Sequence, residues 1–177
     1  MSRPREAEPV KLIMSLFAVD RDVLRNILTC LIETYGGTDF VSGLLSFEYT
    51  SYYAAEMGPS LLRRFVSFER LIRPESLPDV KNLTNGLEDR FAVAGQRTVN
   101  IDPGYIAKAH LILATGKGYT HRPYLRDGIY ADLTLMYSHK TFSTLPWTYP
   151  DYAEKSSIEM FNKIRARYVD QLRNREN

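Results

Sequence analysis

The stretch formed by residues 119–137, YTHRPYLRDGIYADLTLMY, has the pattern of a β-hairpin that turns at residues 126–128. A three-residue loop fits this turn, because a type I turn followed by a left-handed residue places Gly128 where it avoids a Cβ clash. The register then sends three pairs to the core side of the hairpin: Leu125 with Ile129, Pro123 with Ala131, and His121 with Leu133. Three other pairs lie on the opposite side: Tyr124 with Tyr130, Arg122 with Asp132, and Thr120 with Thr134. We therefore expect functional residues on this polar and aromatic side.

Length and composition predict a single folded domain over residues 1–177. The 44% of hydrophobic residues and 25% of charged residues are typical of a globular chain and exclude a disordered one. The formal net charge of +2 is close to neutral, which disfavours nucleic acid and anionic membranes as partners.

The single cysteine, Cys30, excludes an internal disulfide and a cysteine-cluster metal site. The first residues, MSRPREAEPVK, contain no apolar signal segment. No stretch approaches the roughly 18 apolar residues needed to span a bilayer. We therefore expect a cytoplasmic protein without a membrane partner.

The first hundred residues alternate between strand and helix patterns. Asp20 is expected to cap the first helix, Gly36-Gly37 to end it, and Ser76 to open the second helix with a capping box that includes Asp79. The expected elements are a buried strand at 10–19, a helix from 21, strands at 40–50 and 61–72, a helix from 77, and a strand at 97–101 that ends in a turn at 102–104. This β-α-β-β-α-β order predicts an α+β fold with a ferredoxin-like core, in which two helices cover one face of an antiparallel sheet.

The remaining residues are expected to extend or cover that sheet. Residues 105–115 suit either a helix or a strand, and we favour a strand preceded by a loop. After the hairpin, residues 142–152 contain two prolines and are expected to form an extended arm. A last helix is expected from Ser156, with Glu159 completing a capping box. Its basic face is interpreted as solvated surface: Lys163, Arg165, Arg167 and Arg173.

Four segments carry a resemblance to a known family: NIDPGY, THRPYLRDGIYADLTL, LPWTYPDY and TSYYAAEMG. In combination they resemble domain of unknown function 4416, over nearly the whole chain. The resemblance implies a small bacterial protein of about this length, and it brings no established activity. The family pattern prefers glutamate where this chain has Asp132, which preserves a carboxylate, and isoleucine where it has Pro123.

Arg122 and Asp132 allow two interpretations. As a cross-strand ion pair on an exposed hairpin they would contribute little stability. Alternatively, Arg122 is an anion-binding fork that Asp132 holds in place. Lys117, in Gly116-Lys117-Gly118, would add a second positive charge, although the full phosphate-loop pattern is absent.

Other polar residues have weaker signals. Asn100 and Asn85 would either bind a ligand or hold loops in place through hydrogen bonds to the backbone. Trp147, with its neighbours Tyr149 and Tyr152, would stack on a ligand, close a pocket or, by default, bury into the sheet. Three carboxylates have oxygen ligands for a divalent cation but no spacing signature, so no metal site is predicted: Glu56, Asp102 and Asp132.

Two hypotheses follow. In the first, the chain is a small-molecule-binding protein or an enzyme that acts on a phosphorylated or carboxylated compound. Anion binding is assigned to Arg122, Lys117 and Arg97, pocket shape to Tyr124, Tyr130 and Trp147, hydrogen bonding to Asn100 and Asn85, and acid–base catalysis to Asp102 or Asp132; the pattern names no cofactor. We expect alanine at Arg122 to abolish binding and leave the Tm nearly unchanged.

In the second hypothesis the chain is a non-enzymatic interaction module. An aromatic sheet face would then bind a protein partner or single-stranded nucleic acid, and the near-neutral charge weakens the nucleic-acid version. A concave site where Arg122, Asp132, Asn100 and Lys117 converge favours the first hypothesis, and a flat aromatic surface favours the second.

Overall fold

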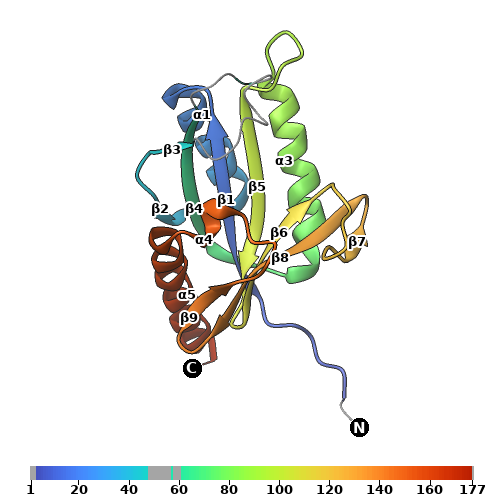
Figure 1. Ribbon diagram of the computed structural model, residues 1–177, viewed down its shortest axis with the longest axis vertical. Coiled ribbons are helices and arrows are strands. Elements are labelled where there is room, and N and C mark those ends of the chain that lie inside the picture. The colour runs from blue at the N-terminus through green and yellow to red at the C-terminus, as the bar shows by residue number, and fades with distance from the viewer. Residues whose placement is uncertain (1–2, 48–56, 58–60, 177) are drawn as a thin grey trace.

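The structure is a computed structural model that describes residues 3–47, 57 and 61–176 (Figure 1). The strands are β1 (Val10–Ala18), β2 (Thr38–Val41), β3 (Leu45–Phe47), β4 (Leu61–Ile72), β5 (Val99–Ile106), β6 (His110–Thr115), β7 (Tyr124–Arg126), β8 (Ile129–Ser138) and β9 (Thr141–Thr144). The helices are α1 (Arg21–Tyr35), the short 3-10 helix η1 (Pro74–Ser76), α3 (Leu77–Phe91), α4 (Pro150–Ala153) and α5 (Lys155–Glu176). Among these described helices, none is both long enough and apolar enough to cross a lipid bilayer.

The described strands form one nine-stranded antiparallel sheet, which confirms the predicted α+β class. The strand order is β2-β4-β1-β5-β6-β8-β7, with β3 on β4 and β9 on β8. Every residue of β1 is buried, as the continuous apolar run 10–19 predicts for a central strand. The predicted strand 40–50 is instead divided into β2 and β3, and its last residues lie outside the described part.

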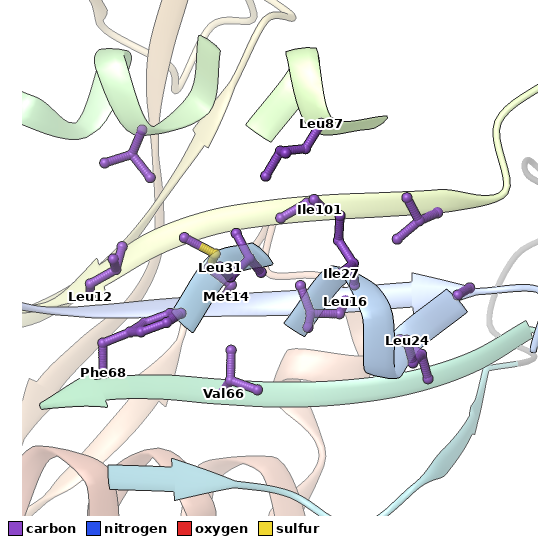
Figure 2. Packing of buried hydrophobic residues seen from close by; sticks show 13 residues of the cluster. Leu12, Met14, Leu16, Leu24, Ile27, Leu31, Val66, Phe68, Leu87 and Ile101 are labelled. Carbon is purple, nitrogen blue, oxygen red and sulfur yellow. The ribbon is translucent and has the colours of Figure 1, made fainter. Parts of the chain in front are cut away.

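Helices α1 and α3 cover one face of the sheet. Figure 2 shows the even-numbered residues of β1 meeting both helices and the neighbouring strands β4 and β5. The labelled cluster consists of Leu12, Met14, Leu16, Leu24, Ile27, Leu31, Val66, Phe68, Leu87 and Ile101. Alternation along β1 puts the odd-numbered residues on the opposite face. Both faces of the central strand are therefore packed.

Helix α5 covers the opposite face with an apolar stripe at helical spacing, as predicted: Phe161, Ile164, Tyr168 and Leu172. Lys11 of β1 lies beneath α5 with no exposed surface. Its ammonium donates to Gln171 Oε1 at 2.6 Å, to the Phe68 carbonyl at 2.9 Å and to Asp39 Oδ2 at 2.5 Å. These three acceptors offset the cost of burying a charge and tie α5 to the central strand.

Two of the predicted helix signals are confirmed. The Asp20 carboxylate accepts the Val23 N–H at 2.8 Å at the start of α1. Gly36, with φ of 92°, ends this helix.

The predicted capping boxes are wrong. Ser76 donates its hydroxyl to the Arg73 carbonyl at 2.6 Å and makes no side-chain cap of α3. Asp79, the expected box partner, instead binds Arg126 of the hairpin at 2.5 Å. Helix α5 begins at Lys155, so Ser156 lies inside the helix rather than at its cap.

The predicted turn at residues 102–104 is also wrong, because β5 runs straight through Asp102-Pro103-Gly104. Gly104 pairs with Leu113 of β6 at very close range. A Cβ on Gly104 would meet the Ile112 carbonyl oxygen and lie 2.7 Å from Leu113 Cδ2. Glycine is therefore needed for the approach of β6, and Pro103 costs little because its missing N–H faces no paired strand on that side.

The sheet forks at this point. Along the described residues of β5, pairing with β6 covers only residues 104–106, whereas pairing with β1 covers the full strand. Figure 1 shows β6 leaving β5 obliquely while α3 lies beside the other end of β5. The preferred strand interpretation for residues 105–115 is confirmed, since His110–Thr115 forms β6.

The hairpin has a two-residue turn rather than the predicted three-residue loop. Asp127 and Gly128 both have positive φ, 53° and 78°, and Arg126 pairs with Ile129. This is the geometry that favours Asp-Gly in tight hairpins. The register shifts between Tyr124 and Arg126, so Leu125 is an extra, 40% exposed residue instead of a core residue. The pair Tyr124–Tyr130 is as predicted.

The expected extended arm is only partly extended, because β9 opens it and α4 closes it. The basic face of α5 is not simply solvated. Arg165 donates to the Lys108 carbonyl at 2.8 Å and lies 3.3 Å above the centre of the Tyr137 ring. Arg167 binds the Asp39 carbonyl. These two guanidinium groups therefore help to attach α5 to the rest of the molecule.

Candidate functional site

A pocket of about 650 Å³ lies in the fork between β5 and β6. Helix α3 borders one side, and β8 and the segment that ends in α4 border the other. Its polar lining residues are Lys81, Asn85, Glu88, Arg97, Asn100, Asp102, Thr115, Lys117, Asp132 and Asp151. Its apolar lining includes Phe17, Leu113, Ala114, Pro150 and the rings of Tyr149 and Tyr152.

Helix α3 supplies the hydrogen bonds that a neighbouring strand would give to the open edge of β5. Lys81 donates to the Ile101 carbonyl at 2.8 Å, and Glu88 Oε1 accepts the Ile101 N–H at 2.6 Å. The two side chains are two helical turns apart and therefore lie on one side of α3. Both are buried, and burial raises the pKa of Glu88.

The raised pKa of Glu88 predicts a pH dependence of stability. The pKa of Glu88 in the folded protein lies above the ordinary value of 4.5, so the folded state binds this proton more tightly than the unfolded state. The stability that Glu88 contributes is therefore fully present below pH 4.5, and it is lost as the pH rises through the pKa of Glu88 in the folded protein. In Glu88→Gln, which keeps an acceptor for the Ile101 N–H, this loss is absent.

Urea denaturation of wild type and Glu88→Gln across this pH range measures the effect. We expect the difference in unfolding free energy to move in favour of the variant as pH increases. Two parallel pH profiles would contradict the proposed burial of an ionisable Glu88.

Arg97, two residues before β5, forms a chain of contacts along the pocket wall with two polar residues of that strand. Arg97 Nη1 donates to Asn100 Oδ1 at 3.1 Å and lies 3.5 Å from Glu88 Oε2. Asn100 in turn donates to Asp102 Oδ2 at 2.9 Å. The predicted placement of Asn100 and Asp102 on one side of the strand is therefore confirmed, and the pocket receives an ordered set of donors and acceptors.

Arg122 holds the other wall together. Its Nε donates to Asp132 Oδ2 at 2.8 Å, Nη1 to the Lys117 carbonyl at 3.1 Å and Nη2 to the Tyr149 hydroxyl at 2.7 Å. The Arg122 and Asp132 side chains are only 12% and 4% exposed, so this is a buried pair rather than a surface one. Asp132 and Lys117 line the pocket, and Arg122 fixes them from behind. These contacts favour a role for Arg122 in positioning Asp132 and Lys117 over direct contact of Arg122 with an anion.

The aromatic residues expected to shape the pocket lie mostly beside it. Trp147 is 38% exposed and donates from Nε1 to the Leu133 carbonyl at 2.8 Å. Tyr124 is exposed and packs edge-on against Tyr130 with 5.2 Å between ring centres. None of these three is among the described residues that line the pocket, which is bordered instead by Tyr149 and Tyr152. The default burial of this arm is confirmed only for Tyr152.

The predicted register placed His121 among apolar core residues, and this prediction is wrong. Its ring stacks on Trp147 at 4.7 Å, and its Nε2 lies 3.8 Å from Asp132 Oδ2. The reason is that residues 119–122 form a turn, with Tyr119 bonded to Arg122, rather than continuing strand β7.

Sequence reasoning missed a buried arginine that binds a residue of the pocket lining, Asp151. Arg63 of β4 binds the Asp151 carboxylate and donates from Nε to Ser15 Oγ at 3.0 Å. Its guanidinium carbon lies 4.0 Å from the centre of the Phe65 ring and 5.2 Å from that of Tyr152. The available signal was its alternation: Arg63 occupies an inward position two residues before Phe65.

Metal binding has no prearranged ligand set in the described residues. There, no three histidine, cysteine, aspartate or glutamate side chains are grouped to hold an ion. Glu56, one of the carboxylates considered from the sequence, lies outside the described residues.

The arrangement defines an α+β protein with a charged, partly apolar pocket at a fork in its sheet. The chain belongs to the family described as Domain of unknown function (DUF4416), which matches residues 8–168. The sequence resemblance is therefore confirmed. Searches of curated proteins and of solved structures found no match. Three of the segments that carry the resemblance, NIDPGY, THRPYLRDGIYADLTL and LPWTYPDY, contribute residues to the pocket: Asn100, Asp102, Asp132, Tyr149 and Asp151.

Proposed function

We propose that the pocket in the sheet fork binds a small phosphorylated or carboxylated compound. The observation that carries the proposal is the convergence of Lys117, Arg97 and Asn100 on one concave site together with Asp132. These groups come from separate elements, and a charged concave site of this kind suits a small polar ligand. Asn85 of α3 adds an amide on the same pocket.

The cations in and around the pocket support an anionic group on the ligand. Four carboxylates of the described residues line the pocket, and three of them have a close cation: Arg122 for Asp132, Arg63 for Asp151 and Arg97 for Glu88. Lys117 adds a further positive charge from the exposed loop between β6 and the hairpin. Lys117 and Arg97 are the lining cations that could contact an anionic group of the ligand.

The two residues considered for catalysis differ in their surroundings. The Asp132 carboxylate is held by a guanidinium at 2.8 Å, which supports a positioning role. The Asp102 side chain is 32% exposed and supports direct contact with the ligand. The proposal therefore concerns binding, with Asp102 as the carboxylate that a ligand would touch.

The alternative, an interaction module, has support from exposed apolar residues around the hairpin: Tyr119, Tyr124, Leu125 and Trp147. A concave charged pocket is the feature expected of a ligand-binding protein and favours the first hypothesis. The single domain, the cytoplasmic location and the expectation that nucleic acid is not a partner stay predictions.

We also interpret the core of the sheet as ferredoxin-like. The adjacent antiparallel strands β2, β4, β1 and β5, with α1 and α3 on one face, support this interpretation. The chain order of these elements is the split βαβ order. Strands β6 to β9 then extend the core, and the pocket lies where the extension begins.

The experiment is isothermal titration with ethyl phosphate and with propionate. In Lys117→Ala we expect about tenfold weaker binding of ethyl phosphate, since one charge-assisted contact is lost. The Tm of the variant stays close to that of wild type because Lys117 is exposed. Binding to wild type also weakens as sodium chloride is raised.

Lys163→Ala is the matched control, because Lys163 is an exposed lysine on α5 away from the pocket. It removes the same charge and keeps wild-type affinity. If neither compound binds wild type, or if both variants lose affinity equally, an anion site at Lys117 is excluded.

A further inference from the structure

Asp102 has a different environment from the other acidic residues of the pocket. Its Oδ2 accepts the Asn100 amide at 2.9 Å, and its Oδ1 lies 3.8 Å from Lys81 Nζ. That ammonium is engaged elsewhere, since it donates to the Ile101 carbonyl at 2.8 Å. The cation nearest to Asp102 is therefore 3.8 Å away. Each of the carboxylates of Glu88, Asp132 and Asp151 has a cation within 3.5 Å.

The position of Asp102 makes this carboxylate available to a ligand. It lies in the middle of β5, a strand paired along its full length with β1, so its backbone is firmly placed. The Asn100 amide orients Oδ2, and Oδ1 lies on the Lys81 side of the pocket. With 32% of its side chain exposed and Lys81 Nζ at 3.8 Å, Asp102 can receive a further donor at hydrogen-bond distance.

We infer that the ligand carries a protonated amine that binds Asp102, in addition to the anionic group that meets Lys117. This inference rests on the proposed function and narrows it to amino-phosphates or amino acids. An ammonium group would give Asp102 a close cation, as Asp132 and Asp151 already have. It would also offset part of the negative charge that a phosphate or carboxylate brings into a pocket to which the described residues contribute four carboxylates.

Two matched pairs of probes test this inference in calorimetric titrations. Phosphoethanolamine and ethyl phosphate differ by the amine alone, and so do β-alanine and propionate. In wild type we expect the amine-bearing member of each pair to bind about tenfold more tightly, as one charge-assisted contact allows. In Asp102→Asn this preference disappears, because the negative charge that binds the amine is gone. Asp22→Asn, which removes an exposed carboxylate on α1, retains the preference.

The outcomes separate this inference from the proposed function. Equal affinity within each pair in wild type overturns the amine inference but leaves anion binding standing. Tighter binding of 2-hydroxyethyl phosphate than of phosphoethanolamine also overturns it, because it identifies a neutral hydroxyl as the donor. An amine preference that survives in Asp102→Asn places the amine elsewhere and rejects the role of Asp102. Absence of binding for all probes contradicts the proposed function itself.

Discussion

Gly104→Ala is expected to destabilise the protein by about 3 kcal/mol or more, at the upper end of the cost of overpacking a rigid site. The added methyl would meet the Ile112 carbonyl oxygen and lie 2.7 Å from Leu113 Cδ2. One of these neighbours is backbone, and β5 is held against β1 along its length, so neither strand can move away cheaply. Urea denaturation monitored by circular dichroism measures the loss.

Gly86→Ala provides the control for this prediction. Gly86 lies in the middle of α3, where a Cβ would meet nothing within 4 Å. Alanine there is expected to stabilise the protein by about 0.5–1 kcal/mol, the difference in helix propensity. If Gly104→Ala is as stable as wild type, β6 does not approach β5 as described and the fork has another geometry.

Arg122→Ala is expected to cost about 3–5 kcal/mol and to abolish ligand binding, because it leaves a buried carboxylate without its partner. The sequence alone predicted a nearly unchanged Tm, on the assumption of an exposed residue. The structure corrects this prediction, since the guanidinium binds Asp132, Lys117 and Tyr149 at once. Thermal and chemical denaturation, together with titration of ethyl phosphate, measure both effects.

Two further variants make this prediction specific. Arg126→Ala removes an arginine of the same hairpin whose ion pairs are exposed, so its cost is expected to be below about 1 kcal/mol. Adding Asp132→Asn to Arg122→Ala removes the unpaired charge and is expected to recover part of the lost stability. A double variant less stable than Arg122→Ala would show that charge burial is not the cause.

The elements of the fold with strong local signals were predictable from the sequence. The continuous apolar run of β1 and the Asp20 cap of α1 have one reasonable interpretation each, and the structure confirms both. Asp102-Pro103-Gly104 shows the limit of such signals. Its composition is that of a turn, but pairing with β1 and the close approach of β6 give the segment a strand conformation.

The candidate site was predictable only in part. Arg122 and Asp132 were paired correctly, although the predicted three-residue loop is wrong and Arg122 reaches Asp132 from a turn rather than from a strand. The contribution of α3 depends on the edge of β5 being open, which results from the fork in the sheet. No local pattern in the sequence marks that fork, so the role of Glu88 and Lys81 was not predictable.

The most direct test of the account is a two-dimensional ¹⁵N NMR titration of the full chain with ethyl phosphate. Binding in the fork predicts saturable shifts of the backbone amides of Gly116 and Lys117 and of the Asn100 side-chain amide, with little change along α5. Shifts confined to the basic residues of α5, or no shifts at all, would contradict a ligand site between β5 and β6.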